Sequence, residues 1–444
     1  MKLHGTMRIN EAGHLEIGGC DAVELVRQFG SPLYVMDEAL LRDNCRAYVE
    51  SFQKSYPNAE VIYASKVFST MAMCRLIAEE DMGLDVVSGG ELYTALASGF
   101  SPARIYFHGN NKTPAELEMA LEARVGHYVV DNFSELELLN ELARQRKIKA
   151  KILIRVSPGI DAHTHHYIKT GMIDSKFGLA IANGQAMMGV EKALSLKNLD
   201  FKGIHCHIGS QIFDLDSYKE AVRTMMTFVR DIRNLTGSVC EQLNMGGGLG
   251  IYYSEGDAPR PISELVALMT ATVRDMAAEY GLPLPKIIVE PGRSIVGEAG
   301  TTLYTVGSVK DIPGIRTYVA VDGGMTDNIR PALYQAKYEA VLANKMNLPS
   351  EETVSIAGKC CESGDMLIWD VELPPTAPGD VLAVSSTGAY NYSMASNYNR
   401  NTKPAVVFVR GGKADLVVRR ESYDDLIRND IVPDRMQNKI ACLA

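Results

Sequence analysis

"RIYFHGNNKTPAELEMALEARVGHYVVD", residues 104–131, contains one complete example of the pattern that sets the fold. It begins and ends with short runs of β-branched and aromatic residues, 104–109 and 127–131, which are typical of buried strands. Between them, segment 114–125 has apolar residues three and four positions apart, as on one face of a helix. A strand, a helix and a second strand in this order predict two parallel strands joined by a crossover helix.

The same alternation extends in both directions along the chain. Eight repeats over roughly 250 residues are typical of an α/β fold of the (β/α)8 TIM-barrel type. A doubly wound open sheet is the alternative, and the number of strands favours the barrel. The eight strand-like runs are AEVIYAS (59–65), LDVVS (84–88), RIYFHG (104–109), HYVVD (127–131), KILIRV (151–156), FKGIHCHIG (201–209), EQLNMGGG (241–248) and KIIVEPG (286–292).

The two ends of the chain have a different pattern. After about residue 300, strand-like runs such as TTLYTVGSVK are separated by turn residues with little helix, which is typical of an antiparallel sheet. The first 36 residues also hold strand candidates, HLEIGG and PLYVMD. We therefore expect residues 37–297 to form the barrel, and residues 1–36 with 298–444 to form a mostly antiparallel β domain.

Composition excludes several classes of protein. A chain of 444 residues is too long for one ordinary core, so two domains are expected. The net charge is −9 and the basic residues are dispersed, which gives no sign of a nucleic-acid site. The chain shows neither a signal peptide nor an apolar run long enough to span a membrane. Its eight cysteines form no regular framework, which is typical of a reduced, cytoplasmic protein.

Polar residues and glycines follow the predicted barrel strands, where chemistry collects in this fold. Lys66 follows the first strand, three successive glycines (246–248) follow the seventh, and Glu290 stands at the end of the eighth. The loops after strands seven and eight are the usual phosphate site of a TIM barrel. Glycines there let backbone N–H groups close around an anion.

A lysine, a phosphate site and a carboxylate at one rim suggest pyridoxal 5'-phosphate as the cofactor. Lys66 would bind its aldehyde, and the glycines with Ser210 would bind its phosphate. Glu290 would face the pyridine nitrogen and keep it protonated, which makes the ring a strong electron sink. His207 would stack on the ring. The simpler alternatives are a surface lysine at a strand end and a core histidine whose hydrogen bonds are satisfied.

Eight motifs resemble those of the meso-diaminopimelate decarboxylase family, which belongs with eukaryotic ornithine decarboxylase and alanine racemase to the barrel-type pyridoxal-phosphate enzymes. They occur in order and at family-like spacing from about residue 60 to 400. One departure is Val67-Phe68, where Ala-Asn more often follows the lysine. The motifs are YASK (63–66), FHGNNK (107–112), HCHIGSQI (205–212), NMGGGLG (244–250), VEPGRSIVG (289–297), VDGGMTDNIRPALY (321–334), CESGD (361–365) and GAYNYSMASNYN (388–399).

The resemblance implies an alanine racemase-like fold and a role for each site residue. Lys66 would form the Schiff base, and Cys361 would be the proton donor. The family is homodimeric, with Cys361 reaching into the partner's site. The residues implied in cofactor binding are Lys66, His207, Ser210, Gly247, Gly248, Glu290, Gly292, Arg293 and Tyr390. Those implied in substrate binding are Arg293, Arg330, Tyr334, Glu362 and Tyr390.

The resemblance also implies the reaction, decarboxylation of meso-2,6-diaminopimelate to L-lysine and carbon dioxide, the last step of lysine biosynthesis. Arg293 and Arg330 agree with this substrate, because arginine binds a carboxylate bidentately. Ornithine and lysine have no distal carboxylate and would leave these arginines unpaired. For Arg330 a surface salt bridge is the alternative. Decarboxylation of another basic amino acid or of carboxynorspermidine, a racemase and a non-catalytic homologue are the competing interpretations of the chain.

Two further patterns need an interpretation. Cys361 could be a small buried apolar residue, but its neighbours Glu362 and Asp365 indicate a polar loop. They would also raise the pKa of its thiol, which suits a proton donor. The cluster of His163, His165 and His166 has no carboxylate or cysteine at a suitable spacing, so we expect a flexible loop near the rim and no metal site.

Overall fold

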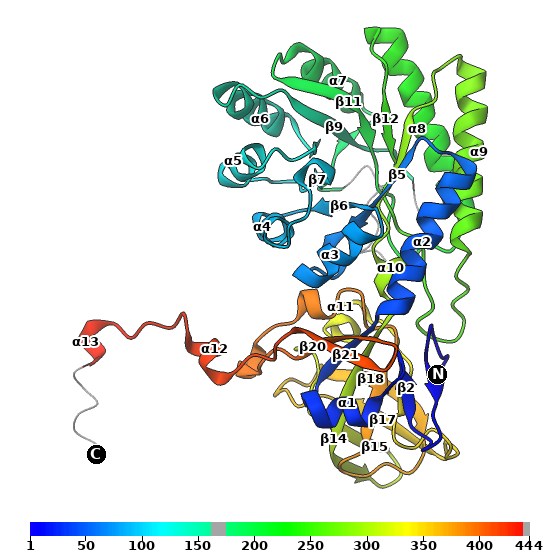
Figure 1. Ribbon diagram of the computed structural model, residues 1–444, viewed down its shortest axis with the longest axis vertical. Coiled ribbons are helices and arrows are strands. Elements are labelled where there is room, and N and C mark those ends of the chain that lie inside the picture. The colour runs from blue at the N-terminus through cyan, green and yellow to red at the C-terminus, as the bar shows by residue number, and fades with distance from the viewer. Residues whose placement is uncertain (161–174, 438–444) are drawn as a thin grey trace.

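The computed structural model describes residues 1–160 and 175–437 and consists of a barrel beside a β domain (Figure 1). Eight parallel strands form the barrel, and pairing between β8 and β9 closes it. This confirms the predicted (β/α)8 barrel and excludes the open sheet. The strands are β5 (Ala59–Ala64), β6 (Gly83–Val86), β7 (Ile105–Phe107), β8 (His127–Val130), β9 (Ala150–Ser157), β11 (Leu199–His205), β12 (Gln242–Asn244) and β13 (Lys286–Val289), and the short β10 (Leu179–Ala180) pairs with β9.

Helices surround the barrel (Figure 1). The helix in segment 114–125 begins where the sequence requires it, because Thr113 and Glu116 form a capping box and Pro114 occupies the first turn. Within the described residues, no helix combines the length and apolar character needed to cross a membrane. The helices are α2 (Glu38–Ser55), α3 (Met71–Glu79), α4 (Gly89–Ala97), α5 (Pro114–Glu122), α6 (Phe133–Gln145), α7 (Gln185–Ser195), α8 (Leu215–Thr236), α9 (Ile262–Tyr280) and the short α10 (Arg293–Val296).

Side chains fill the inside of the barrel. Ile62, Tyr106, Val129, Leu153 and Ile288 project from five different strands into one buried cluster. The barrel is therefore a packed core rather than a pore, and only its rim is available for a binding site.

The β domain is mostly antiparallel, as predicted, and β14 pairs with three of its strands, β4, β15 and β19. Two pairs are parallel, β4–β20 and β15–β17. Its strands are β4 (Leu33–Asp37), β14 (Gly300–Ile312), β15 (Arg316–Val321), β16 (Ala340–Leu342), β17 (Glu352–Ala357), β18 (Met366–Leu373), β19 (Val381–Val384), β20 (Ala405–Arg410) and β21 (Lys413–Val418). The short helices α11 (Arg330–Tyr334), α12 (Tyr423–Ile427) and α13 (Asp434–Gln437) also lie in this part of the chain.

The N-terminal segment contributes to the β domain in two ways. The PLYVMD stretch forms β4, which lies between β14 and β20. The HLEIGG stretch instead forms β2 (Leu15–Ile17) of a separate sheet with β1 (Arg8–Ile9) and β3 (Cys20–Asp21), followed by α1 (Ala22–Phe29). Leu15 and Ile17 still pack in the same apolar cluster as Leu33 and Leu303 of the main sheet.

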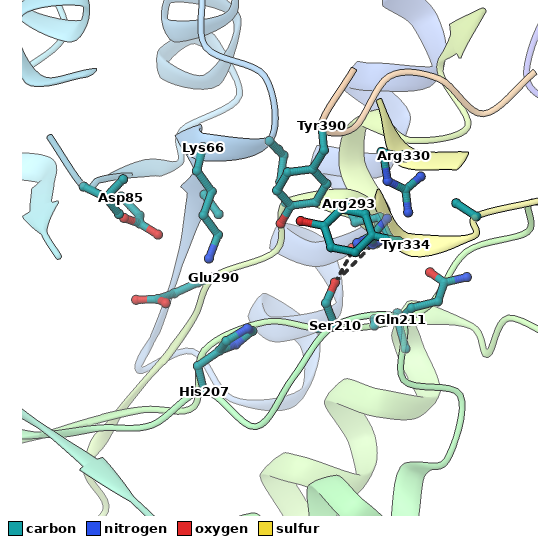
Figure 2. A pocket seen from close by; sticks show the side chains of 18 of the residues that line it. Lys66, Asp85, His207, Ser210, Gln211, Glu290, Arg293, Arg330, Tyr334 and Tyr390 are labelled. Carbon is teal, nitrogen blue, oxygen red and sulfur yellow. Dashed lines mark hydrogen bonds between the residues drawn. The ribbon is translucent and has the colours of Figure 1, made fainter. Parts of the chain in front are cut away.

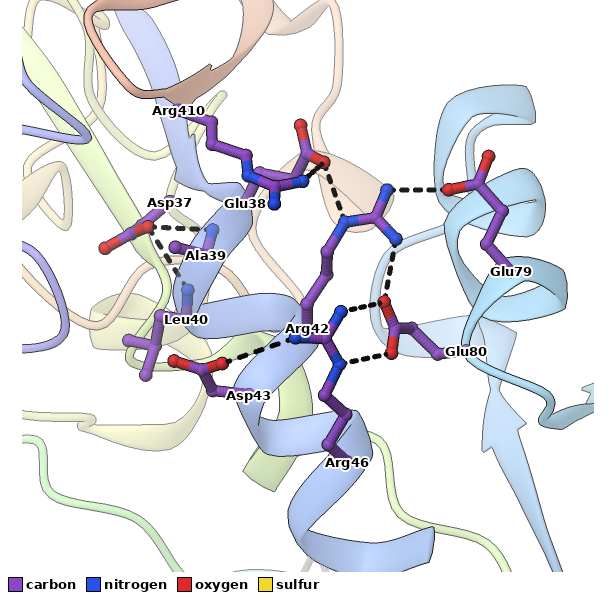
Figure 3. A network of polar contacts seen from close by, with 10 residues as sticks. All are labelled: Asp37, Glu38, Ala39, Leu40, Arg42, Asp43, Arg46, Glu79, Glu80 and Arg410. Carbon is purple, nitrogen blue, oxygen red and sulfur yellow. Dashed lines mark hydrogen bonds and ion pairs between the residues drawn. The ribbon is translucent and has the colours of Figure 1, made fainter.

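A network of ion pairs connects the β domain to two barrel helices (Figure 3). On α2, Arg42 contacts Glu38 at 2.8 Å, and it also contacts Glu79 and Glu80 at the end of α3, at 2.7 and 2.8 Å. Arg410, at the end of β20, contacts the same Glu38 at 3.2 Å. Residues far apart in sequence are thus held together where the barrel meets the β domain.

Candidate active site

A cavity of about 700 Å³ opens at the C-terminal ends of the barrel strands and is also lined by β-domain residues (Figure 2). The structure brings most of the predicted site residues to this one cavity. They are Lys66, His207, Ser210, Gly248, Glu290, Gly292, Arg293, Arg330, Tyr334 and Tyr390.

Lys66 lies in a short 3-10 turn, Ser65–Val67, directly after β5. Its neighbours Ser65 and Val67 are buried, whereas its own side chain extends into the cavity (Figure 2). The backbone of this turn is held from the β domain, because the carbonyl of Val67 accepts hydrogen bonds from the Tyr390 N–H at 2.9 Å and the Ser393 hydroxyl at 3.0 Å. The amine therefore projects from a rigid support.

Glu290, at the end of β13, is a buried carboxylate surrounded by polar nitrogens. The Nδ2 atom of Asn244 donates to its Oε1 at 2.7 Å, and Nε2 of His205 lies 3.1 Å from its Oε2. His108 Nε2 lies 2.8 Å from Oε1. Burial alone would raise the pKa of Glu290, but His108 and His205 outweigh it and hold that pKa well below its usual range. Glu290 is therefore ionised at neutral pH.

The pKa of His205 indicates how the cluster around Glu290 is protonated. Burial lowers the pKa of His205 to about 4, so its imidazole is neutral and its Nε2–H can donate to the carboxylate. His108, His205 and Glu290 offer atoms within 4.8 Å of one another, a spacing that also suits a metal ion. The amide of Asn244 favours the hydrogen-bonded arrangement, because its donor nitrogen, which cannot ligate a cation, lies on the same carboxylate.

The glycine segment 246–248 lies where three loops approach closely. A Cβ on Gly247 would stand 2.2 Å from the carbonyl oxygen of Glu290, and one on Gly248 would stand 2.4 Å from that of Gly209. The N–H of Gly247 donates to Nδ1 of His207 at 3.3 Å. Only glycine fits this segment, so the loops after β11, β12 and β13 can meet at one side of the cavity.

Arg293 and Arg330 are buried cations bonded to neutral groups. Arg293 donates to the Ser210 hydroxyl at 3.0 and 3.1 Å and to that of Tyr253 at 2.5 Å. Arg330 donates to the hydroxyl of Tyr338. Among the residues that the structure describes, neither guanidinium pairs with a carboxylate. A buried charge without a counter-ion is costly, so this end of the cavity is suited to an anionic ligand.

Tyr334 and Tyr390 lie between the arginines and Lys66 (Figure 2). The ring of Tyr390 is 4.9 Å from the guanidinium carbon of Arg293, within range of a cation–π contact. Tyr390 and another cavity residue, Gln211, have φ angles of 64° and 59°, in the left-handed region. Such strained backbone in side-chain-bearing residues is concentrated at functional sites.

Comparison with known proteins identifies relatives along nearly the whole chain. Residues 42–297 match the family model described as pyridoxal-dependent decarboxylase, pyridoxal binding domain. Diaminopimelate decarboxylase from Bacillus subtilis (strain 168) is 54% identical over 431 residues, 97% of this chain and 98% of that protein. The chain belongs to the diaminopimelate decarboxylase family.

Solved structures of this family have the same fold. The crystal structure of diaminopimelate decarboxylase from M. jannaschii in complex with L-lysine superposes with a TM-score of 0.91 at 39% identity, over 97% of this chain and 98% of that one. The Helicobacter pylori diaminopimelate decarboxylase complexed with L-lysine has a TM-score of 0.84 at 33% identity, over 91% and 98% of the two chains. The barrel and β domain seen here are thus the architecture of the family.

The cavity has the groups that the pyridoxal cofactor of a diaminopimelate decarboxylase requires. It offers the amine of Lys66, the ionised Glu290 and the Ser210 hydroxyl beside Gly248. Burial, followed by the charges of Lys66 and Arg155, lowers the pKa of His207 well below its usual value. A neutral imidazole is therefore available to lie against an aromatic ring.

Cys361, Glu362 and Gly247 are the predicted site residues that do not line this cavity. Both Cys361 and Glu362 are exposed in the loop between β17 and β18. The N–H of Cys361 donates to Oδ1 of Asn399 at 2.7 Å. Within one chain, Cys361 is therefore not among the residues that line the cavity of Lys66.

Asp85 and Arg155 line the cavity and were not predicted from the sequence. Asp85 projects from β6 next to Lys66 (Figure 2), and its Oδ1 has no hydrogen-bond partner in the described structure. Burial raises the pKa of Asp85 to about 6. Arg155, on β9, lies over the ring of Phe177 at 4.3 Å. A charged residue inside an apolar strand was the available signal in LDVVS and KILIRV. The predicted loop with His163, His165 and His166 lies outside the described residues.

Proposed function

We propose that this chain decarboxylates meso-2,6-diaminopimelate to L-lysine and carbon dioxide, the last step of lysine biosynthesis, with pyridoxal 5'-phosphate as its cofactor. The observation that carries the proposal is the pair of buried arginines, Arg293 and Arg330, in a cavity that also contains Lys66 and ionised Glu290. Membership in the diaminopimelate decarboxylase family supports the same reaction.

The cavity residues would hold the cofactor at each end. Lys66 would bind its aldehyde carbon, Glu290 its pyridine nitrogen, and His207 would lie against its ring. Its phosphate would be bound by Ser210, Gly248 and Gly292, which line the cavity, with Gly247 adjoining them, and Arg293 and Tyr390 would also contact the cofactor. When bound, pyridoxal phosphate supplies an electron sink for the bond between the α-carbon and its carboxylate.

Glu290 acts by remaining an anion. The pyridine nitrogen of a ring that faces a carboxylate keeps its proton, because the ion pair favours the charged form. His108 and His205 hold the pKa of Glu290 well below its usual range, so the pairing does not depend on a pH near neutrality. The two histidines are therefore positioning residues for Glu290.

Arg293 and Arg330 would bind the carboxylate at the far end of the substrate. Within the described part of the chain, each guanidinium donates only to hydroxyl groups, so a carboxylate would supply a counter-charge. Tyr334 and Tyr390, between the arginines and Lys66, would contact the body of the substrate (Figure 2). A distal amine without a carboxylate, as in ornithine, would leave this pair of cations unmatched.

The proton donor would come from a second copy of the chain. We infer a homodimer in which Cys361 of the partner subunit donates its thiol proton to the carbon that has lost carbon dioxide, and Glu362 of the partner subunit contacts substrate. The exposed position of the Cys361 loop, away from its own cavity, supports this assignment. The same proposal includes the domain division and the location. Residues 37–297 would form the barrel, and residues 1–36 with 298–444 would form the β domain. The protein would be cytoplasmic.

The test is carbon dioxide release from a panel of amino acids, with purified protein and added pyridoxal phosphate. The panel contains meso-diaminopimelate, L-lysine, L-ornithine, L-arginine and carboxynorspermidine. We expect release from diaminopimelate alone, no release by Lys66→Ala, and normal release by the control Lys54→Ala, whose lysine is on the surface of α2. Release from a different amino acid would overturn the roles of Arg293 and Arg330, and no release at all would overturn the proposed reaction.

A further inference from the structure

The C-terminal arm, residues 422–437, leaves the β domain after β21 and runs away from the body of the molecule (Figure 1). It contains α12 and α13, helices of five and four residues. Its large apolar side chains are exposed, with Tyr423 at 81% and Ile431 at 88% of full accessibility, and Ile427 and Met436 are exposed as well. Helices this short are not stable in isolation, so the arm needs a surface that covers it.

The arm is connected to the loop that carries Cys361. Arg400 donates to the carbonyl of Leu426 at 2.8 Å and to Oδ2 of Asp430 at 2.6 Å, and both of these acceptors belong to the arm. The preceding residue, Asn399, accepts from the N–H of Cys361 at 2.7 Å. Hydrogen bonds thus join the arm to Arg400 and join the neighbouring Asn399 to Cys361, the predicted proton donor.

The connecting loop is held in an unusual conformation. Asn399 and Arg400 have φ angles of 51° and 56°, in the left-handed region that side-chain-bearing residues rarely adopt. Tyr398, in the same loop, has an exposed ring, and its hydroxyl donates to the carbonyl of Cys361 at 3.4 Å. Because ion pairs as exposed as Arg400–Asp430 contribute little in water, the loop needs additional contacts to keep this shape.

We propose that the C-terminal arm docks on a second copy of this chain, in continuation of the surface that carries Cys361, and that Arg400 couples this docking to the position of the Cys361 loop. The inference rests on the proposed homodimer with shared sites. Because Cys361 does not line its own cavity, it would face another copy, and the arm is bonded to Arg400, next to the Asn399 that holds the backbone of Cys361. Docking would bury Tyr423, Ile427 and Ile431 and strengthen the Arg400 ion pair by removing water from it.

The first experiment measures dimer dissociation by sedimentation over a range of concentrations. Ile431→Asp places a charge on the arm without affecting the monomer, because that side chain is exposed there. We expect its dissociation constant to rise at least 10-fold. Ile315→Asp, at a side chain that is also largely exposed in the turn between β14 and β15, is the matched control and should leave dimerisation unchanged. A chain that ends after Glu421 should behave like Ile431→Asp; unchanged dimerisation in both arm variants would overturn the proposal.

A second measurement follows Cys361 itself, by its rate of alkylation read from the labelled peptide. At a concentration where the unaltered protein is dimeric, Arg400→Ala should increase that rate several-fold, whereas Arg410→Ala should not. An equal rate in all three proteins would overturn the coupling through Arg400. Both readouts are independent of decarboxylation. An active enzyme whose dimerisation is unchanged in the arm variants would refute only the docking of the arm, and an inactive protein whose dimerisation depends on the arm would refute only the proposed reaction. A monomeric protein would refute both the docking of the arm and the shared active site.

Discussion

The Glu290 carboxylate shows how single residues prepare this site. Its surroundings come from three strand ends, since His108 follows β7, His205 ends β11 and Asn244 ends β12. Asn244 is itself oriented by the Gly246 N–H, which donates to its Oδ1 at 2.9 Å. The charge on Glu290 is thus fixed before any ligand binds, which is the preorganisation that electrostatic catalysis requires.

At this scale we predict the effect of Arg330→Lys. Lysine keeps the positive charge but loses the planar fork that binds a carboxylate through two hydrogen bonds. We expect kcat/KM for diaminopimelate to fall roughly 10- to 100-fold, the equivalent of one charge-assisted hydrogen bond. Steady-state carbon dioxide release measures it, with Arg260→Lys, at an exposed ion pair before α9, as the control. An unchanged kcat/KM would mean that Arg330 does not bind the substrate.

The sequence allowed prediction of some of these residues and not of others, for a physical reason. Lys66 and Glu290 stand at strand ends, where the fold places chemistry, so their position alone was informative. Asp85 and Arg155 lie within strands, where a charge in an apolar run marks the residue but does not show which way its side chain points, because that direction depends on how the barrel closes. The contacts of His205 with Glu290 depend in the same way on strands that are distant in sequence.

At the scale of the element, β8 shows the contrast between the two ends of a barrel strand. His127, its first residue, lies opposite the cavity end and stacks on Tyr106 of β7, with ring centroids 4.3 Å apart. Burial lowers the pKa of His127 to about 4.

The periodicity of the sequence predicted the eight strands well. It predicted a strand at β2, in HLEIGG, but missed the separate sheet that β2 forms with β1 and β3, because strands of two residues contain too few positions for a period.

We predict that His127→Phe makes the stability of the protein less dependent on pH. The folded-state pKa of His127 is below its unfolded value of about 6.5, so the unfolded chain binds a proton that the folded chain does not, and stability falls as the pH drops from about 6.5 towards 4. Phenylalanine keeps the stacking on Tyr106 but cannot bind a proton, so this pH-dependent contribution to stability is removed.

Denaturant unfolding at pH 7.5 and 5.5 measures the effect. The difference in unfolding free energy between these two pH values should shrink by about 1 kcal/mol in the variant. Loss of the contact between His127 and Gln242 lowers stability at both pH values and therefore cancels in the difference. Carbon dioxide release should be unaffected, because His127 is at the far end of the barrel. An equal pH dependence in the two proteins would contradict the buried, neutral state of His127.

At the scale of the whole molecule, the two parts of the chain contribute different halves of one site. The barrel supplies Lys66 and Glu290, and the β domain supplies Arg330 and Tyr390 from the same copy. Cys361, also from the β domain, is exposed and does not line that cavity. The position of the arm could not be predicted from the sequence, because its helices of five and four residues are too short to show a period and its apolar side chains are exposed in the described structure.

Complementation between inactive variants tests the shared site. We mix Lys66→Ala with Cys361→Ala, dissociate and reassociate the dimers, and measure carbon dioxide release. Random pairing makes half of the dimers mixed, and each mixed dimer has one complete site, so activity should recover to about a quarter of normal. Lys66→Ala mixed with the Lys66→Ala/Cys361→Ala double variant should stay inactive. Failure of the first mixture to regain activity would place Cys361 outside the partner's site.

The position of β4 between β14 and β20 has a consequence for how the chain is made. β4 ends at Asp37, whereas β14 begins at Gly300 and β20 at Ala405, so both neighbours are synthesised long after it. At about 5–20 residues per second, β4 leaves the ribosome tens of seconds before it can pair on either edge. The barrel strands, β5 to β13, are all complete before β14 begins. Synthesis thus delivers a barrel first and completes the β domain last, around a strand that has been waiting with unpaired edges since the beginning.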